Sequence, residues 1–175
     1  PPGAPRSRER DAFFVLVVPS GEHQAKTVFY EQLARWAAAR YFERQGGITA
    51  GLQAVLERLN ENLFQHNARH PGQPFYADVT CAVLREQEVF VARTDGGGVL
   101  LWQQGGTRAF PEGVVPVGSR PLGMAPRPEF QVTRFMVEAG DVLALSDGGL
   151  FTIPPGVLQP AVRRNDIQAT VAGLK

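Results

Sequence analysis

Hydrophobic positions recur with a helical period in the first part of the chain and with a strand period in the rest. A short β-branched and aromatic run, Ala12–Val18, ends in Pro, Ser and Gly, which predicts a buried strand followed by a turn. From Glu22 to about Arg44, apolar residues recur near helical spacing without Gly or Pro, so we expect a long amphipathic helix with Ser20 available as its N-cap. After two glycines, the same spacing predicts a second helix from about Thr49 to Ala68.

Beyond His70 the pattern changes to short strands. Five are predicted, at Asp78–Leu84, Glu88–Arg93, Gly98–Gln104, Phe130–Val137 and Val142–Ser146. We expect the first three to form a meander and the last two a hairpin, whereas the Pro- and Gly-rich segment Phe110–Pro128 predicts a loop. Ile167–Leu174 is compatible with a last strand. One strand, two helices and then successive hairpins indicate an α+β fold with the helix pair on one face of the sheet.

Composition narrows the class of protein further. The length of 175 residues fits a single domain, for which we expect residues 12–175, with residues 1–11 as a flexible lead-in or linker from a larger protein. Acidic and basic residues nearly balance, 17 against 18, which argues against a nucleic-acid partner, and no apolar run is long enough for membrane insertion. The single cysteine, Cys81, excludes an internal disulfide and suggests either a reduced, cytoplasmic compartment or a simple packing role in the core.

Several segments resemble one known family. PLGM (Pro121–Met124) followed by FQVTRFMVEAGDVLALSDGGL (Phe130–Leu150) is similar to the LG…pGDvLlLcSDGL block of the metal-dependent (type 2C, PPM) serine/threonine protein phosphatases. EVFVARTDGGGVLLW (Glu88–Trp102) resembles that family's yvAnvGDSRayl hairpin, and DVTCAVL (Asp78–Leu84) resembles its GtTavva strand. The resemblance implies an α-β-β-α sandwich of antiparallel sheets. We expect its second helical layer to be reduced, because the stretch from Leu150 to Asn165 is short and carries three prolines.

The resemblance also implies a metal centre, which this sequence matches only in part. The family's chemistry uses two divalent cations, held by several carboxylates, to activate a bridging water while an Arg holds the phosphate. Pro19 and Ser20 stand where the family's DGxGG segment has Asp and Gly, so the bridging carboxylate is missing. Asp95 is displaced by one place from the acid of the GDSR turn. The final DN-I element reads Asn165-Asp166-Ile167, with the acid and the amide exchanged.

Asp147, in SDG, is the one acid that matches the family pattern. Alone it supplies too few ligands for Mg²⁺ or Mn²⁺, so we favour an Asp that hydrogen-bonds its own backbone and closes a hairpin. The candidate metal ligands are therefore Asp147, Asp166 and Asp95. Arg6 and Asp11 imitate the family's phosphate Arg and first acidic ligand, but Asp11 adjoins the first strand, which favours a charged residue at its start.

These observations lead to three hypotheses of function. The first is a catalytically inactive phosphatase 2C-like module (a pseudophosphatase) with a regulatory signalling role, which needs no cofactor and binds a protein partner or a neighbouring domain. The alternative is an active metal-dependent phosphatase with a rearranged Mg²⁺ or Mn²⁺ site built from Asp147, Asp166, Asp95 and Asp11. The third is a small-molecule sensor that uses the vacated metal cleft.

Overall fold

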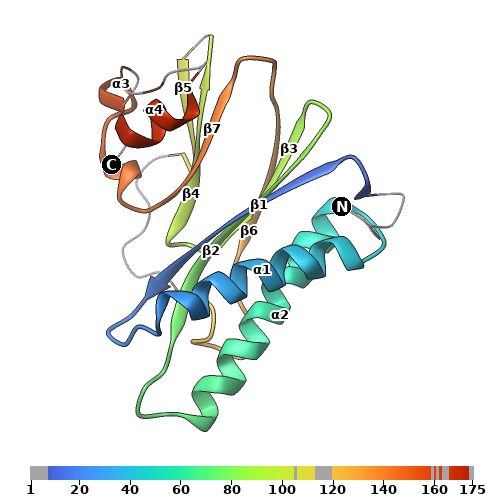
Figure 1. Cartoon of the computed structure of the whole chain (residues 1–175), viewed down its shortest axis with the longest axis vertical. Coiled ribbons are helices and arrows are strands. Elements are labelled where there is room, and N and C mark those ends of the chain that lie inside the picture. Colours follow the sequence, from blue (N-terminus) through green and yellow to red (C-terminus); the bar gives the residue numbers. More distant parts are fainter. Residues whose placement is uncertain are drawn as a thin grey trace.

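The computed structural model describes residues 8–104, 106–112, 120–158, 160, 162 and 166–173. Two antiparallel β-sheets pack face to face, with helices on their outer faces (Figure 1). The predicted α+β sandwich with a long helix pair on one face is therefore confirmed. In chain order, its elements are β1 (Asp11–Ser20), α1 (Thr27–Glu43), α2 (Ile48–Arg69), β2 (Tyr76–Arg85), β3 (Glu88–Arg93), β4 (Gly97–Gln103), β5 (Gly106–Phe110), β6 (Gln131–Met136), β7 (Val142–Asp147), the 3₁₀-helix η2 (Leu150–Thr152), α3 (Pro155–Leu158) and α4 (Ile167–Gly173).

The helix pair covers the outer face of the four-stranded sheet, whose strand order is β1-β2-β3-β6. Alternate residues of β1, such as Phe13 and Val15, pack against α1 and α2, because successive side chains of a strand point to opposite faces. The Phe13 ring stacks on Tyr41 of α1 at 4.8 Å between centroids. Leu56 and Leu59 of α2 are buried in the same cluster. The amphipathic spacing read from the sequence therefore places both helices on this sheet.

The second sheet has three described strands, in the order β5-β4-β7. Its central strand β4 is apolar on both faces: Val99 and Leu101 point into the sandwich, and Leu100 and Trp102 point outward. The outward residues pack against the short elements η2 and α3 through Phe151 and Leu158. This is the reduced second helical layer that the sequence predicts.

The predicted strand pairings are correct in one place and wrong in two. The β2–β3 hairpin forms, with Cys81 opposite Ala92. The meander is wrong, because β4 leaves this sheet and pairs with β5 and β7. The hairpin expected from the last two strands is also wrong, because β6 pairs with β3 in one sheet while β7 pairs with β4 in the other. Short loops favour hairpins, but strands in a sandwich can switch sheets, and the period-2 pattern does not specify the partner.

Two other expectations fail at element ends. Ser20 does not cap the first helix, since it is the last residue of β1, opposite Tyr76, and α1 begins at Thr27 after the N-cap residue Lys26. The expected last strand Ile167–Leu174 is instead the helix α4, over Ile167–Gly173. Leu174, Asn165 and residues 113–119, the middle of the segment expected to be a loop, lie outside the described residues. No helix in the described part of the chain is both long and apolar enough to cross a membrane.

Candidate functional site

The end of β7 and the start of β4 meet on one edge of the sandwich, where β4 also packs against β2. Asp147, the last residue of β7, lies opposite Gly97, the first residue of β4. Gly97 in turn packs so closely on β2 that an added Cβ would lie 2.3 Å from Oγ1 of Thr80. Because β2 belongs to one sheet and β4 and β7 to the other, this edge brings side chains from both sheets together. Two of the three candidate metal ligands, Asp147 and Asp95, lie at this edge.

Asp147 is exposed, and its carboxylate is engaged with its own turn. Its Oδ1 accepts a hydrogen bond from the backbone N–H of Gly149 at 3.0 Å and a longer one from Oγ of Ser146 at 3.4 Å. A bond from an Asp side chain to the backbone two residues on is an Asx turn, which is the local role expected from the SDG sequence. The expected hairpin does not follow, because the chain continues into η2.

Asp95 and Asp166 occupy different settings. Asp95 lies in the turn between β3 and β4, where its carbonyl accepts a 3.4 Å hydrogen bond from Nη1 of Arg93. Asp166 is exposed at the start of α4, and its Oδ1 accepts the N–H of Ala169 at 2.8 Å. This is helix N-capping, which satisfies a donor that the first turn of a helix leaves free. The side chain of Asp166 is therefore used by the helix that replaces the expected strand.

The end of β1 supplies no carboxylate. Pro19 lies opposite Ala77 and Ser20 opposite Tyr76, and the chain then turns at Gly21 with a φ of 85°. An added Cβ at Gly21 would lie 2.9 Å from the Tyr76 ring, so this turn is closely packed as well as left-handed. A hydroxyl and a proline ring occupy the place where the resemblance implies a bridging carboxylate.

Asp78 is a site residue that the sequence reading missed. It lies on β2 and is 7% exposed, and its Oδ1 accepts hydrogen bonds from Oγ1 of Thr94 at 3.0 Å and from the N–H of Gly96 at 3.2 Å. An added Cβ at Gly96 would lie 2.3 Å from Cγ and Oδ2 of Asp78. The Asp78 carboxylate thus fills the space that a side chain at position 96 would take. One signal in the sequence could have revealed it: Asp78 stands where the GtTavva strand of the phosphatase family has its glycine.

Arg93 holds the same turn from the other side. Its guanidinium is buried, 4% exposed, and donates to the carbonyls of Thr94 at 3.2 Å and Gly97 at 3.0 Å. It also donates to Oε1 of Gln131 on β6 at 2.6 Å. Burial lowers the pKa of Arg93, which the nearby Asp95 partly offsets. Together Arg93 and Asp78 fix the β3–β4 connection by hydrogen bonds to four of its polar groups.

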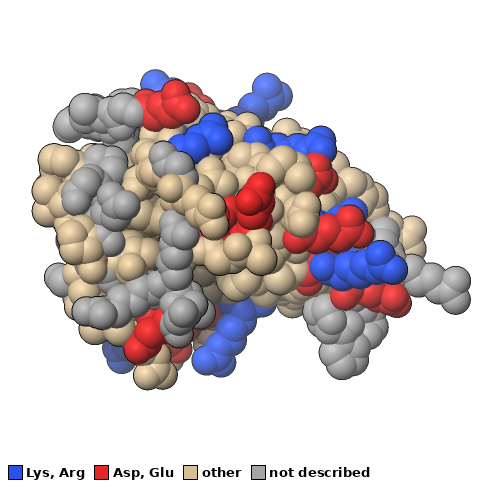
Figure 2. Space-filling view, turned by 90° about the horizontal axis from the view of Figure 1, so that it is seen from above, with Lys and Arg blue, Asp and Glu red and all other residues tan. Residues whose placement is uncertain are grey.

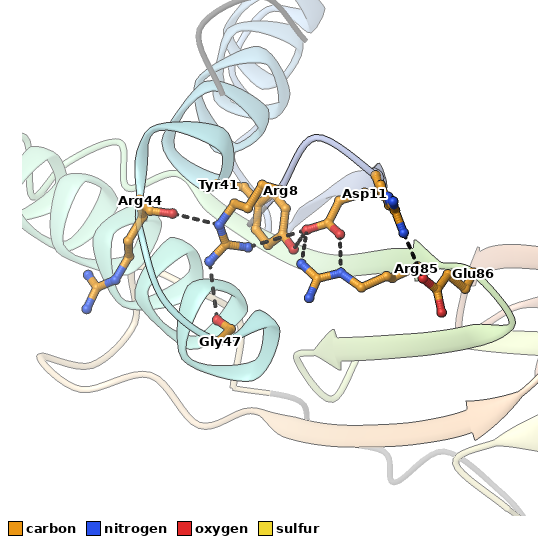
Figure 3. Close-up of polar contacts among 8 residues, drawn as sticks. Arg8, Asp11, Tyr41, Arg44, Gly47, Arg85 and Glu86 are labelled. Carbon is orange, nitrogen blue, oxygen red and sulfur yellow. Dashed lines mark hydrogen bonds and ion pairs between the residues drawn. The ribbon is translucent and has the colours of Figure 1, made fainter. Parts of the chain in front are cut away.

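Asp11 lies at the other end of β1 from this edge, in a buried polar cluster (Figure 3). Its carboxylate accepts hydrogen bonds from Oη of Tyr41 at 2.7 Å and from Nε of Arg85 at 2.6 Å. The fully buried Arg8 lies 3.8 Å from the same carboxylate and donates through Nε to the carbonyl of Arg44 at 2.6 Å. Burial and the bond to Asp11 raise the pKa of Tyr41, and the bond to Asp11 raises the pKa of Arg85.

Residues that were expected to belong to a flexible lead-in take part in this cluster. Arg8 fits so closely that an added Cβ at Gly51 of α2 would lie 2.3 Å from its Nη2. Arg8 and Asp11, at the end of the expected flexible lead-in, are therefore packed against the helices and β2, whereas Glu9 and Arg10 between them are exposed. Arg6 lies outside the described residues. Asp11 is the first residue of β1, and its contacts with Tyr41, Arg85 and Arg8 fit the structural role expected for a charged residue at the start of a strand.

Cys81 has no chemical role at the strand-end edge. It is fully buried on the helix face of β2, and burial raises the pKa of its thiol to about 12. Only the thiolate is a good nucleophile or metal ligand. The sequence reading, in which this cysteine packs in the core, agrees with its surroundings.

The described donors do not fit a two-cation centre. Among the described residues, no three His, Cys, Asp or Glu side chains gather in a way that would hold a metal ion. At the strand-end edge, one oxygen of Asp78 already accepts two hydrogen bonds and one oxygen of Asp147 accepts a backbone N–H. Mg²⁺ and Mn²⁺ need near-octahedral oxygen ligands with several carboxylates. We therefore derive no reaction through a metal at this edge.

Comparison with solved structures identifies the fold. The chain superposes on PppA, described as a key regulatory component of T6SS in Pseudomonas aeruginosa, with a TM-score of 0.75 and 15% identity over 93% of this chain and 77% of that one. It superposes on the S. agalactiae serine/threonine phosphatase with a TM-score of 0.76 and 13% identity over 98% and 87% of the two chains. The catalytic domain of the serine/threonine phosphatase PstP, solved with two manganese ions, gives 0.71 and 16% over 98% and 86%. These matches define the class: the chain has the fold of the type 2C serine/threonine phosphatases.

Comparisons by sequence give no match. No model of a known protein family and no curated protein matches the chain. At identities of 13 to 16%, the structural likeness establishes the fold and leaves the chemistry to the residues of the site.

Proposed function

We propose that this chain is a phosphatase 2C-like module without metal-dependent phosphatase activity, which regulates a partner protein or a neighbouring domain by binding. The observation that carries the proposal is the replacement of the bridging carboxylate at the end of β1 by Pro19 and Ser20 in an otherwise retained framework. Asp147 remains at its strand end, but it caps its own turn. The similarity to PppA, described as a regulatory component, supports a regulatory role.

A hollow beside the altered turn is the surface that we propose for binding. It has a volume of about 480 Å³ and is lined by Ser20, His23, Tyr76 and Met124, among others. Met124 is 49% exposed, and flexible methionine side chains are frequent at adaptable binding surfaces. The turn that no longer carries metal ligands therefore faces a space large enough for a partner's side chains.

The catalytic half of the proposal is tested by phosphatase assays of the chain with Mn²⁺ and either a phosphoserine peptide or a chromogenic phosphate ester. We expect no turnover above that of a heat-denatured sample. Turnover that needs Mn²⁺ and is lost in Asp147→Ala would contradict the proposal and favour the rearranged site.

The binding half is tested with two exposed methionines. Met124 lines the hollow, whereas Met136 lies on β6 and is 56% exposed. Proteins that co-purify with the full-length protein are compared by mass spectrometry between Met124→Arg and Met136→Arg. We expect the first substitution alone to remove a partner, and equal behaviour of the two variants would exclude the hollow as the binding surface.

On the surface, acidic and basic side chains are interspersed over the face shown in Figure 2, with no extended region of one sign. This distribution supports a protein partner over nucleic acid, which needs a basic stripe. The cytoplasm remains the compartment that we propose, because the buried thiol of Cys81 has no partner for a disulfide in this chain.

A further inference from the structure

We propose that the cleft at the other end of the sandwich, away from the strand-end edge, binds a small amphipathic cation, an aryl- or alkylammonium compound. The cleft lies between the two sheets and has a volume of about 220 Å³. Its floor is formed by Ala82, Val89 and Leu101, which are all buried. In the β4–β7 register, Leu101 lies opposite Leu143, four residue pairs away from Gly97 and Asp147. The cleft is thus separate from the edge that carries the proposed regulatory function.

The apolar walls of the cleft are open to solvent. Phe14 of β1 points away from the helices, because its neighbours Phe13 and Val15 pack against them, and it is 49% exposed. Leu143 and Leu145 of β7 line the same cleft and are only half-buried. A phenylalanine half exposed beside two half-exposed leucines leaves apolar surface in water that a ligand would cover.

The volume of the cleft limits the size of the apolar group that a ligand can place in it. An apolar cavity of about 150 Å³ is enough to bind benzene. At about 220 Å³, this cleft can hold a six-membered ring with a short substituent. The rings of Phe14 and of such a ligand could pack edge to face or offset, as aromatic pairs prefer.

The charged residues at the rim of the cleft determine which charge is favoured in a ligand. Glu138 and Asp141, in the connection from β6 to β7, both line it. Oδ2 of Asp141 is already used, since it accepts the N–H of Glu138 at 2.9 Å and Nε2 of Gln103 at 2.8 Å. Glu138 is exposed to solvent. Among the described residues that line this apolar cleft there are two acids and no base, which favours a cationic head over a neutral or anionic one.

The test uses three ligands that share a phenyl ring and a short chain: phenethylammonium, the neutral 2-phenylethanol and the anion 3-phenylpropionate. Each is titrated up to about 20 mM, a range suited to weak small ligands, into protein with ¹³C-labelled methyl groups. We expect phenethylammonium to shift the methyl signals of Ala82, Val89 and Leu101 and to bind more tightly than the alcohol, with the carboxylate weakest.

Two variants and a control assign the effect to the cleft. Glu138→Gln should weaken phenethylammonium by about three- to fivefold, the range of an exposed ion pair, and leave the alcohol unchanged. Glu57→Gln is the matched control, because it removes the same charge from an exposed position of α2 on the helix face. Phe14→Ala should weaken all three ligands, and its melting curve establishes that the fold is kept. The proposal is overturned if the floor methyl signals do not move, or if Glu138→Gln and Glu57→Gln have equal effects.

Discussion

Replacing Gly96 by Ala should destabilise the fold through a single neighbour, the buried carboxylate of Asp78. The added Cβ would lie 2.3 Å from Cγ of Asp78, far inside the shortest contacts that real Cβ atoms make, so the carboxylate must move. Moving it breaks its hydrogen bonds to Oγ1 of Thr94 and the N–H of Gly96. Hydrogen bonds to a charged group contribute about 1.5–3 kcal/mol each, so losing both should lower the free energy of unfolding by about 3–6 kcal/mol. Gly96 does not have a left-handed backbone, so strain at a positive φ does not contribute.

A double-mutant cycle separates this mechanism from a general sensitivity of the turn. Asp78→Ala alone loses the same two hydrogen bonds, whereas Asp78→Ala/Gly96→Ala has room for the new methyl group. The double variant should therefore be no less stable than Asp78→Ala, so the coupling energy should equal the loss of Gly96→Ala, about 3 kcal/mol or more. Urea unfolding with matched m-values measures all four proteins. If the two single losses add to within about 0.5 kcal/mol, the carboxylate does not fill the space at position 96 and the reasoning fails.

Three further predictions concern other polar groups. Asp11→Ala should cost about 3–5 kcal/mol in urea unfolding, because it leaves the fully buried Arg8 without its nearest carboxylate, and a cost below about 1 kcal/mol would refute this role. Asp147→Ala should cost only about 1 kcal/mol, as for loss of a cap, and Asp147→Asn, which keeps the acceptor, should be nearly neutral. Burial, then His70 and Arg69, lower the pKa of His66 in the folded state, so its contribution to stability is present above the unfolded pKa of about 6.5 and is lost as the pH falls through the lower folded value. Thermal melting of His66→Gln should show a weaker loss of stability in that range, and an unchanged pH profile would contradict the assignment.

Periodicity located the two long helices and six of the strands, but it missed β5, took α4 for a strand and did not reveal which strands pair. The spacing of Leu52, Val55, Leu56 and Leu59 defines a face of α2 because a helix bonds only to itself. The run of β4 does not reveal its sheet, since Val99 and Leu100 are buried on opposite faces whichever strands adjoin it. Asp166 shows the same limit, because an N-capping aspartate and a ligand at the start of a strand look alike in sequence.

Part of the candidate site could be predicted, namely the positions at which this sequence differs from the motifs of the phosphatase family. Pro19 and Ser20 could be read directly, because neither residue type can provide a carboxylate. Asp78 was not found, since its importance arises from a contact with Gly96, which is 18 residues away along the chain. The acid in place of the glycine of the family's GtT strand was visible in the sequence, but that difference does not show which residue the carboxylate contacts.

Calorimetric titration with Mn²⁺ tests most directly whether this fold has lost its metal centre. It compares the native chain with a variant that carries Pro19→Asp, Ser20→Gly, Asp78→Gly and Gly96→Asp, which returns carboxylates to the two positions named by the resemblance and clears the space at position 96. We predict no binding heat for the native chain at millimolar Mn²⁺ and measurable binding by the variant. Binding of Mn²⁺ by the native chain that disappears in Asp147→Ala would contradict the inactive module and establish a rearranged metal site.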